Sequence, residues 1–250
     1  MDPVCVHVGN RPIYWYGVML ALAFVAAIVH WRVLGRRDRR DGTYAADLAF
    51  WIMIGGVVGA RVAYVCANLD YFLARPVEIL RVDQGGLIYY GGLVGGVLSV
   101  VLFAAFRRQN AADLFDFVAT ALPLGHALGR VGCFLNGCCY GLPAPPPWGV
   151  NVHGESQVPV QLYEAVLNVG IYALLLHAYR HRGDRYGRVT ALYLLTYPAV
   201  RFFLEFLRGD ERVYWGPVTA AQALSLLLFL VGGALWRVVQ RRHDHPAGTV

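Results

Sequence analysis

The stretch at residues 13–34 reads IYWYGVMLALAFVAAIVHWRVL and is followed by GRRDRR at residues 35–40. Its apolar run matches the roughly 20 residues that a helix needs to cross the hydrocarbon core of a bilayer. The arginine cluster follows the run and the flank before it is nearly uncharged, which is the reverse of a cleavable signal peptide. We therefore predict a transmembrane helix at residues 13–34.

Six more stretches have similar length and apolar character. They lie at residues 46–66, 86–106, 114–132, 160–179, 189–207 and 217–236. Hydrophobic residues make up 57% of the 250 residues and charged residues 15%, against roughly 25% charged residues in an average soluble domain. We predict an all-α, polytopic membrane protein with seven transmembrane helices, which forms a single integral-membrane domain over residues 1–250.

The basic residues indicate how the chain is oriented. All 22 are arginines, which with 16 acidic residues give a net charge of +6. Fourteen of them follow the first, third, fifth and seventh spans, at residues 32–40, 107–108, 180–188 and 237–242. Because short cytoplasmic loops carry an excess of Lys and Arg, we expect the amino terminus outside and the carboxyl terminus in the cytoplasm. In a chain this apolar, the positive charge favours anionic lipid as a partner and not nucleic acid.

Three arginines lie within predicted spans or at their ends: Arg61, Arg130 and Arg201. An ionisable side chain inside a bilayer is costly and indicates a functional site, although a structural ion pair or a side chain that reaches the interface stays open as the alternative. Arg208 is a weaker candidate, which we expect to be solvated or in contact with lipid head groups.

The segment YPAVRFFLEFLR at residues 197–208 carries four polar residues at spacings of four, four and three: Tyr197, Arg201, Glu205 and Arg208. On a helix such residues lie along one face. We expect Arg201 and Glu205 to pair and the remaining guanidinium donors to suit a phosphate. A structural clamp between helices is the alternative.

The five cysteines are Cys5, Cys66, Cys133, Cys138 and Cys139. An odd count leaves at least one thiol without a partner in the same chain. For the group at residues 133–139 three interpretations stay open: a structural disulfide, buried inert thiols, and thiol chemistry or metal binding. The spacing lacks the second ligand pair of the common zinc sites, so we predict no metal.

Glycine is concentrated in GGLIYYGGLVGG at residues 85–96 and GHALGRVGCFLNGCCYG at residues 125–141. Small residues let transmembrane helices approach closely, which explains part of both runs. Neither run has the Lys-Ser/Thr ending of a phosphate-binding loop, so nucleotide binding is not supported and we predict no cofactor.

Seven segments, taken together and in order, resemble the prolipoprotein diacylglyceryl transferase family over nearly the whole chain. They are YWYGVM at 14–19, GARVAYV at 59–65, GGLIYYGGLVGG at 85–96, GRVGCFLNGCCYG at 129–141, PVQLYEA at 159–165, YPAVRFFLEFLR at 197–208 and QALS at 222–225. The resemblance implies transfer of a diacylglyceryl group from phosphatidylglycerol to the lipobox cysteine of a prolipoprotein, giving a thioether and glycerol-1-phosphate. It further implies the bacterial cytoplasmic (inner) membrane, a site toward the periplasm, and prolipoprotein signal peptides and membrane lipids as partners.

The same resemblance implies roles for individual residues. Arg130 and Arg201 are the phosphate-facing, catalytic candidates. Tyr16 and Tyr197 would line the substrate pocket, and Asn136 and Glu205 would support it.

The chain departs from the family pattern at three of these motif positions. Tyr90 stands where the family usually has His, while Cys133 and Cys138 stand where it has Asn and Glu. We name Tyr90 as a further catalytic candidate and the group Cys133, Cys138 and Cys139 as a candidate thiol site. Two alternative functions stay open: a paralogue that acts on another lipid acceptor, and a membrane thiol oxidoreductase or metal-handling protein that uses the three cysteines.

Overall fold

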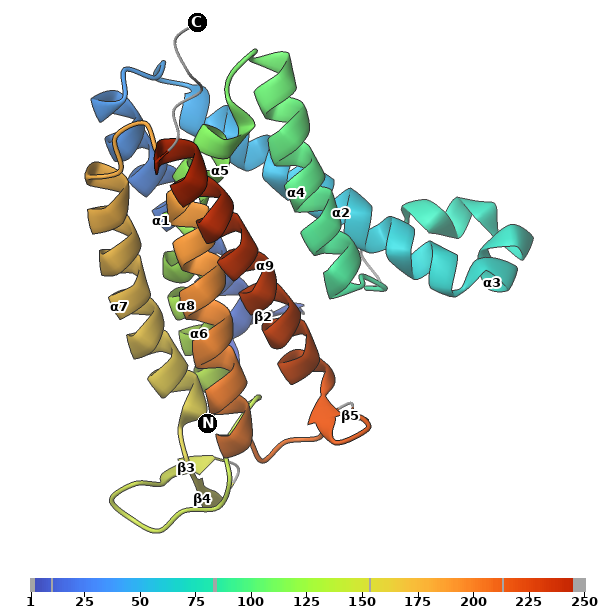
Figure 1. Cartoon of the computed structure of the whole chain (residues 1–250). Helices are drawn as coiled ribbons and strands as arrows, with labels where there is room; N and C mark the ends of the chain where they lie inside the picture. Colours follow the sequence, from blue (N-terminus) through green and yellow to red (C-terminus); the bar gives the residue numbers. More distant parts are fainter. Residues whose placement is uncertain (1–2, 10, 83–84, 153, 213, 245–250) are drawn as a thin grey trace, which may run out of the picture. The chain divides into compact units, whose positions relative to one another are not determined.

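The computed structural model describes residues 3–9, 11–82, 85–152, 154–212 and 214–244 (Figure 1). Within these residues, seven helical segments are long and apolar enough to cross a membrane, which confirms the predicted polytopic all-α class. The segments are Trp15–Arg37, Tyr44–Ala67, Tyr89–Phe106, Ala111–Leu135, Val160–Arg180, Arg188–Leu207 and Ala220–Arg242. The orientation of the termini and the single domain stay predictions.

The chain divides into two compact units. Unit 1 comprises Met1–His30 and Phe115–Val250, and unit 2 comprises Trp31–Leu114. The helices of unit 1 are the beginning of α1 (Trp15–Arg37), the end of α5 (Ala111–Ala119), α6 (Leu122–Leu135), α7 (Val160–Arg180), α8 (Arg188–Leu204) and α9 (Ala220–Asp244). In this unit α6 packs on α7, α7 on α8, and α8 on α9 (Figure 1).

The fourth predicted span consists of two helices, α5 and α6. The interruption falls just before Pro123, which lies in the first turn of α6. Proline is tolerated there because the first turn of a helix has no intrahelical acceptors for its N–H groups. Next to the interruption, Asp116 of α5 is fully buried and accepts hydrogen bonds from Arg182 Nη1 at 3.0 Å and from the backbone and hydroxyl of Thr190 at 2.8 Å each. This network fixes the end of α7 and the beginning of α8 to α5.

Three antiparallel strand pairs, which the sequence pattern did not predict, precede helices of unit 1. They are β1 (Val4–Val8) with β2 (Arg11–Tyr14), β3 (Val150–Val152) with β4 (Glu155–Gln157), and β5 (Tyr214–Trp215) with β6 (Val218–Thr219). The last pair occupies the region where we placed the start of the seventh span, so α9 begins at Ala220 and not at residue 217.

Unit 2 contains the end of α1, α2 (Tyr44–Ala67), α3 (Leu69–Ala74), the 3₁₀ helix η1 (Pro76–Leu80), α4 (Tyr89–Phe106) and the first residues of α5. Glycines bring α2 and α4 into backbone contact. A Cβ added to Gly59 would overlap the carbonyl oxygen of Gly91, and one added to Gly95 would overlap that of Gly55. The predicted role of the first glycine run in helix packing is therefore confirmed.

Arg61 of α2 is a structural residue. Its side chain is buried and donates to four backbone carbonyls: Nε to Ile79 at 2.8 Å, Nη2 to Glu78 at 2.6 Å, and Nη1 to Gly85 at 3.0 Å and Gly86 at 3.1 Å. These bonds satisfy the guanidinium through backbone carbonyls. The ion pair that we considered for Arg61 stays a prediction. The four bonds also hold the segment before α4 in a non-helical path, which explains why that helix begins at Tyr89 and not at residue 86.

Candidate functional site

Arg130 on α6 forms an ion pair with Glu164 on α7. The distance from Arg130 Nε to Glu164 Oε2 is 2.9 Å, and the side chains are 18% and 2% exposed. The contact at this distance is made by Nε and not by a terminal amino group of the guanidinium. An arginine that is held in this way presents its remaining donors in a fixed direction, which suits binding of a phosphate.

Glu164 was not singled out as a site residue from the sequence. The signal that identifies it is a polar stripe on an apolar helix. Gln161, Glu164 and Asn168 lie three and four residues apart on α7, and all three are almost completely buried. Polar residues at this spacing share one helix face.

Arg201 and Glu205 form the second ion pair, at the end of α8. Arg201 Nη1 lies 2.6 Å from Glu205 Oε2, which confirms the predicted pairing. Glu205 is buried, and its Oε1 accepts a hydrogen bond from the hydroxyl of Thr219 at 2.9 Å. Glu205 therefore supports Arg201 from the 3₁₀ turn η3 (Glu205–Leu207) that follows α8.

Arg208 belongs to the same group of charges and is not the solvated side chain that we considered, while its contact with a lipid head group stays a prediction. Its side chain is only 12% exposed, and its Nε lies 4.0 Å from Glu205 Oε2. The same Nε donates to Asp210 Oδ1 at 2.8 Å. The hydrogen bond and the charge of Arg208 outweigh desolvation and lower the pKa of Asp210. Glu205 thus stands between two arginines, of which sequence reasoning emphasised only one.

Tyr197 lies one turn before Arg201 on α8, and its ring packs on the imidazole of His126 from α6. The ring centroids are 4.3 Å apart, and Tyr193 stacks on Tyr197 at 5.6 Å. Among the described residues His126 Nδ1 has no hydrogen-bond partner. His126 precedes Arg130 by one turn, so this aromatic group adjoins the first ion pair.

A glycine brings Tyr16 to the same region. A Cβ on Gly132 of α6 would lie 3.0 Å from Met19 Cβ and 3.5 Å from Tyr16 Cα, so α1 and α6 pack closely at this point. The half-exposed Tyr16 is within electrostatic range of Arg130 and Cys133. The structure thus brings Tyr16 of α1 close to Arg130 of α6, two residues that the sequence predicted at the substrate pocket.

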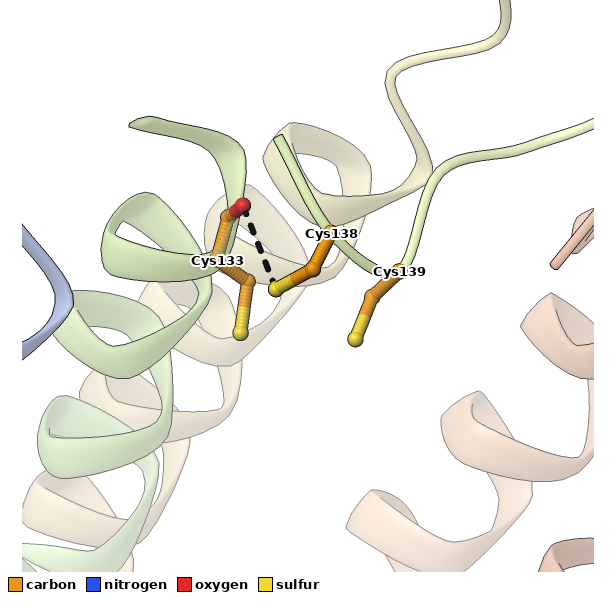
Figure 2. Close-up of side chains that lie close together, drawn as sticks. All are labelled: Cys133, Cys138 and Cys139. Carbon is orange, nitrogen blue, oxygen red and sulfur yellow. Dashed lines mark hydrogen bonds between the residues drawn. The ribbon is translucent and has the colours of Figure 1, made fainter. Parts of the chain in front are cut away.

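The cluster Cys133, Cys138 and Cys139 lies at the end of α6 and in the loop that follows (Figure 2). All three sulfur atoms lie within 4.8 Å of one another. The five cysteines of the chain are all free thiols, so the structural disulfide that we considered is not present. Asn136, the C-cap residue of α6, forms a side-chain hydrogen bond with Cys138.

Backbone bonds hold the three-cysteine loop against neighbouring segments. Gly141 N donates to Val158 O at 3.0 Å, Leu142 N donates to Leu207 O at 2.9 Å, and Gly209 N donates to Tyr140 O at 3.1 Å. Only glycine fits at position 141, because an added Cβ would lie 2.5 Å from Val158 O. The loop is thereby placed beside Arg208.

The two loop cysteines, Cys138 and Cys139, differ in the direction of their pKa shifts. The pKa of Cys139 is lowered to about 5, chiefly by the hydrogen bond with Cys133. The charges of Arg208 and Arg130 also lower this pKa, whereas burial raises it. Burial raises the pKa of Cys138, and the charge of Cys139 adds to the effect. Cys139 is therefore a thiolate at neutral pH, whereas Cys138 stays a thiol. Both Arg130 and Arg208 are within electrostatic range of Cys139.

Tyr90 lies in the first turn of α4, in unit 2. It is half-exposed, and its ring packs edge-on against Tyr89 with centroids 5.7 Å apart. Its catalytic role stays a prediction. The site described above is built entirely from unit 1.

Comparison with known proteins gives a consistent result. The family model described as prolipoprotein diacylglyceryl transferase matches residues 3–238. Three similar proteins are named phosphatidylglycerol–prolipoprotein diacylglyceryl transferase. The one from Geobacter sulfurreducens is 36% identical over 98% of each chain. The one from Bordetella parapertussis is 35% identical over 96% of each chain. The one from Clostridium tetani is 31% identical over 93% of this chain and 95% of the other. This chain therefore belongs to the prolipoprotein diacylglyceryl transferase family.

Proposed function

We propose that this protein transfers the diacylglyceryl group of phosphatidylglycerol to the lipobox cysteine of prolipoproteins. The observation that carries the proposal is the gathering of Arg130, Arg201 and Arg208 in unit 1, each beside a buried or half-buried carboxylate. Three guanidinium groups near the end of membrane-spanning helices suit the phosphate of an anionic lipid. The names of the relatives supply the donor and the acceptor.

The reaction exchanges one bond at the glycerol carbon that carries the phosphate. The sulfur of the acceptor cysteine attacks this carbon as a thiolate, a C–S bond forms, and the C–O bond to the phosphate breaks. The electron pair of the broken bond leaves with the phosphate, which gives glycerol-1-phosphate and a thioether. The thiol proton passes to a base before the attack, and Tyr90 stays our sequence-based candidate for orienting or deprotonating the thiol.

In this scheme Arg130 and Arg201 act on the phosphate. Their donors hold it while the C–O bond breaks and offset the charge that grows on the leaving oxygen. Glu164 and Glu205 keep the two guanidinium groups in place. Tyr16 and Tyr197 line the lipid pocket, and Asn136 supports the loop behind it.

We place the protein in the bacterial cytoplasmic membrane, with the amino terminus and the site on the outer side. The asymmetry of the arginines supports this orientation, since 14 of the 22 follow alternate spans. A signal peptide in the same membrane would deliver the acceptor cysteine to the site.

The test is transfer by the purified protein in phosphatidylglycerol vesicles. The acceptor is a synthetic lipobox peptide, and the readouts are its gain of one diacylglyceryl mass and the release of glycerol-1-phosphate. A peptide with Ser in place of Cys should gain no mass. The proposal is wrong if the folded protein leaves the cysteine peptide unmodified.

The matched variants are Arg130→Gln and Arg107→Gln. Arg107 forms half-exposed ion pairs with Asp41 and Asp47 in unit 2 and serves as the control. We expect Arg130→Gln to lower turnover by about 100-fold or more, the usual effect of removing one donor to a developing charge. Helical content measured on the same samples separates this loss from misfolding, and Arg130→Lys offers a second variant that keeps the charge. Wild-type turnover in folded Arg130→Gln would remove Arg130 from the phosphate role.

A further inference from the structure

No step of the proposed transfer uses the three-cysteine cluster, because the reacting thiol belongs to the acceptor. Cys133 is buried, and Cys138 and Cys139 are half-buried. Figure 2 shows the three side chains extending from the end of α6 and the loop, with their sulfurs close together. Three thiols this close to one another and largely shielded from water form a donor set that suits a ligand that binds sulfur.

The spacing of the sulfurs fits a single metal ion. Metal–thiolate bonds are about 2.3 Å long, so three sulfurs around one ion lie about 4 Å apart. The three sulfurs here are all within 4.8 Å of one another, so small side-chain rotations would bring them to that distance. Gln161 Nε2 donates to Cys138 O at 2.7 Å and holds the backbone of the loop on α7.

The donor set selects the type of ion. Among the described residues the group consists of three cysteines, without a histidine or carboxylate that would complete the four ligands usual for structural zinc. Oxygen-preferring ions such as Mg²⁺ and Ca²⁺ are excluded by the same donor set. Soft monovalent ions such as Cu(I) favour thiolates and accept three of them.

The charge of the surroundings fits as well. Three thiolates around one Cu(I) carry a net charge of −2, and both Arg130 and Arg208 are within electrostatic range of Cys139. Two nearby cations offset this charge in a region that is mostly shielded from water.

We propose that Cys133, Cys138 and Cys139 form a binding site for one soft monovalent metal ion of the Cu(I) class, held by three sulfur ligands. On binding, each sulfur that is still protonated releases its proton to solvent, and a metal–sulfur bond forms to each of the three sulfurs. No change of oxidation state is involved.

The test uses the full chain in detergent with Cys5→Ser and Cys66→Ser, which removes the two thiols outside the cluster. Cu(I) is supplied under anaerobic, reducing conditions in competition with a chromogenic Cu(I) chelator. We expect one equivalent to bind and X-ray absorption to find three sulfur neighbours. Adding Cys139→Ser should weaken binding by about 100-fold, the upper range for loss of a metal-site contact. Binding of no ion by the Cys5→Ser/Cys66→Ser protein would overturn the proposal, as would unchanged affinity after Cys139→Ser.

A second measurement needs no variant within the cluster. One equivalent of Cu(I) should slow alkylation of all three cluster cysteines in the Cys5→Ser/Cys66→Ser protein by at least about tenfold, because thiolates that bind a metal are poor nucleophiles. Equal alkylation with and without Cu(I) would contradict the proposal. Both measurements are made without lipid or peptide substrate, so a negative result leaves the transferase proposal untouched.

Discussion

Replacing Glu164 by Gln removes the negative charge that lies 2.9 Å from Nε of Arg130. Since the carboxylate is 2% exposed, water cannot replace it, and the guanidinium is left with an uncompensated charge. Breaking a buried ion pair costs about 3–5 kcal/mol. The Gln amide oxygen still accepts a hydrogen bond and Arg130 is 18% exposed, so we expect a loss near the lower end, about 3 kcal/mol, in the free energy of unfolding.

A double-mutant cycle measures whether this loss belongs to the pair. Arg130→Gln should cost a similar amount by leaving Glu164 unpaired, whereas the double variant should cost clearly less than the sum, with a coupling of about 2–3 kcal/mol. The assay is unfolding in mixed micelles, followed by helical circular dichroism. The control is Asp47→Asn, whose half-exposed ion pair with Arg107 should be worth about 0–1 kcal/mol. Additive single effects, or a loss from Glu164→Gln no larger than that from Asp47→Asn, would show that the buried pair does not stabilise the protein in this way.

Three other changes have defined outcomes. Gly95→Ala should destabilise the packing of α2 on α4 by about 1–3 kcal/mol, because its Cβ would overlap a backbone carbonyl. A Cβ at the control position Gly96 meets open space, so an equal free energy of unfolding for Gly95→Ala and Gly96→Ala would contradict this prediction. Arg61→Met should speed hydrogen exchange at residues 78–82, since its four bonds to carbonyls are lost, and an unchanged exchange rate would argue against the structural role. The pKa of Cys139 is lowered to about 5, so its thiol is deprotonated above that pH. The alkylation rate of Cys139 in a Cys138→Ser variant should therefore stay level between about pH 6 and pH 8. A rate that rises tenfold per pH unit, as for an ordinary thiol, would contradict the lowered pKa.

The features that sequence predicted are local ones. A membrane span is a property of about 20 consecutive residues, so seven helices could be located from length and apolar character alone. The pairing of Arg201 with Glu205 follows from a spacing of four on one helix, and the close packing of another helix on α4 follows from the glycines in its first half. In each case the sequence neighbours already determine the geometry.

The features that sequence missed depend on how distant segments meet. Arg130 pairs with Glu164 because α6 packs on α7, and no spacing within either helix predicts that contact. Arg61 binds carbonyls of a segment that folds back on α2, so its donors could not be assigned from its own span. The low pKa of Cys139 needs Arg208, which backbone bonds around Gly141 bring to the loop.

Transfer in a living cell can be followed by the mass of a prolipoprotein in a bacterial strain depleted of its own diacylglyceryl transferase. We predict that this chain, produced in that strain, restores one diacylglyceryl group on the lipobox cysteine, and that Arg130→Gln at equal abundance in the membrane does not. A precursor that stays unmodified while the wild-type chain is folded and present in the membrane would contradict the account.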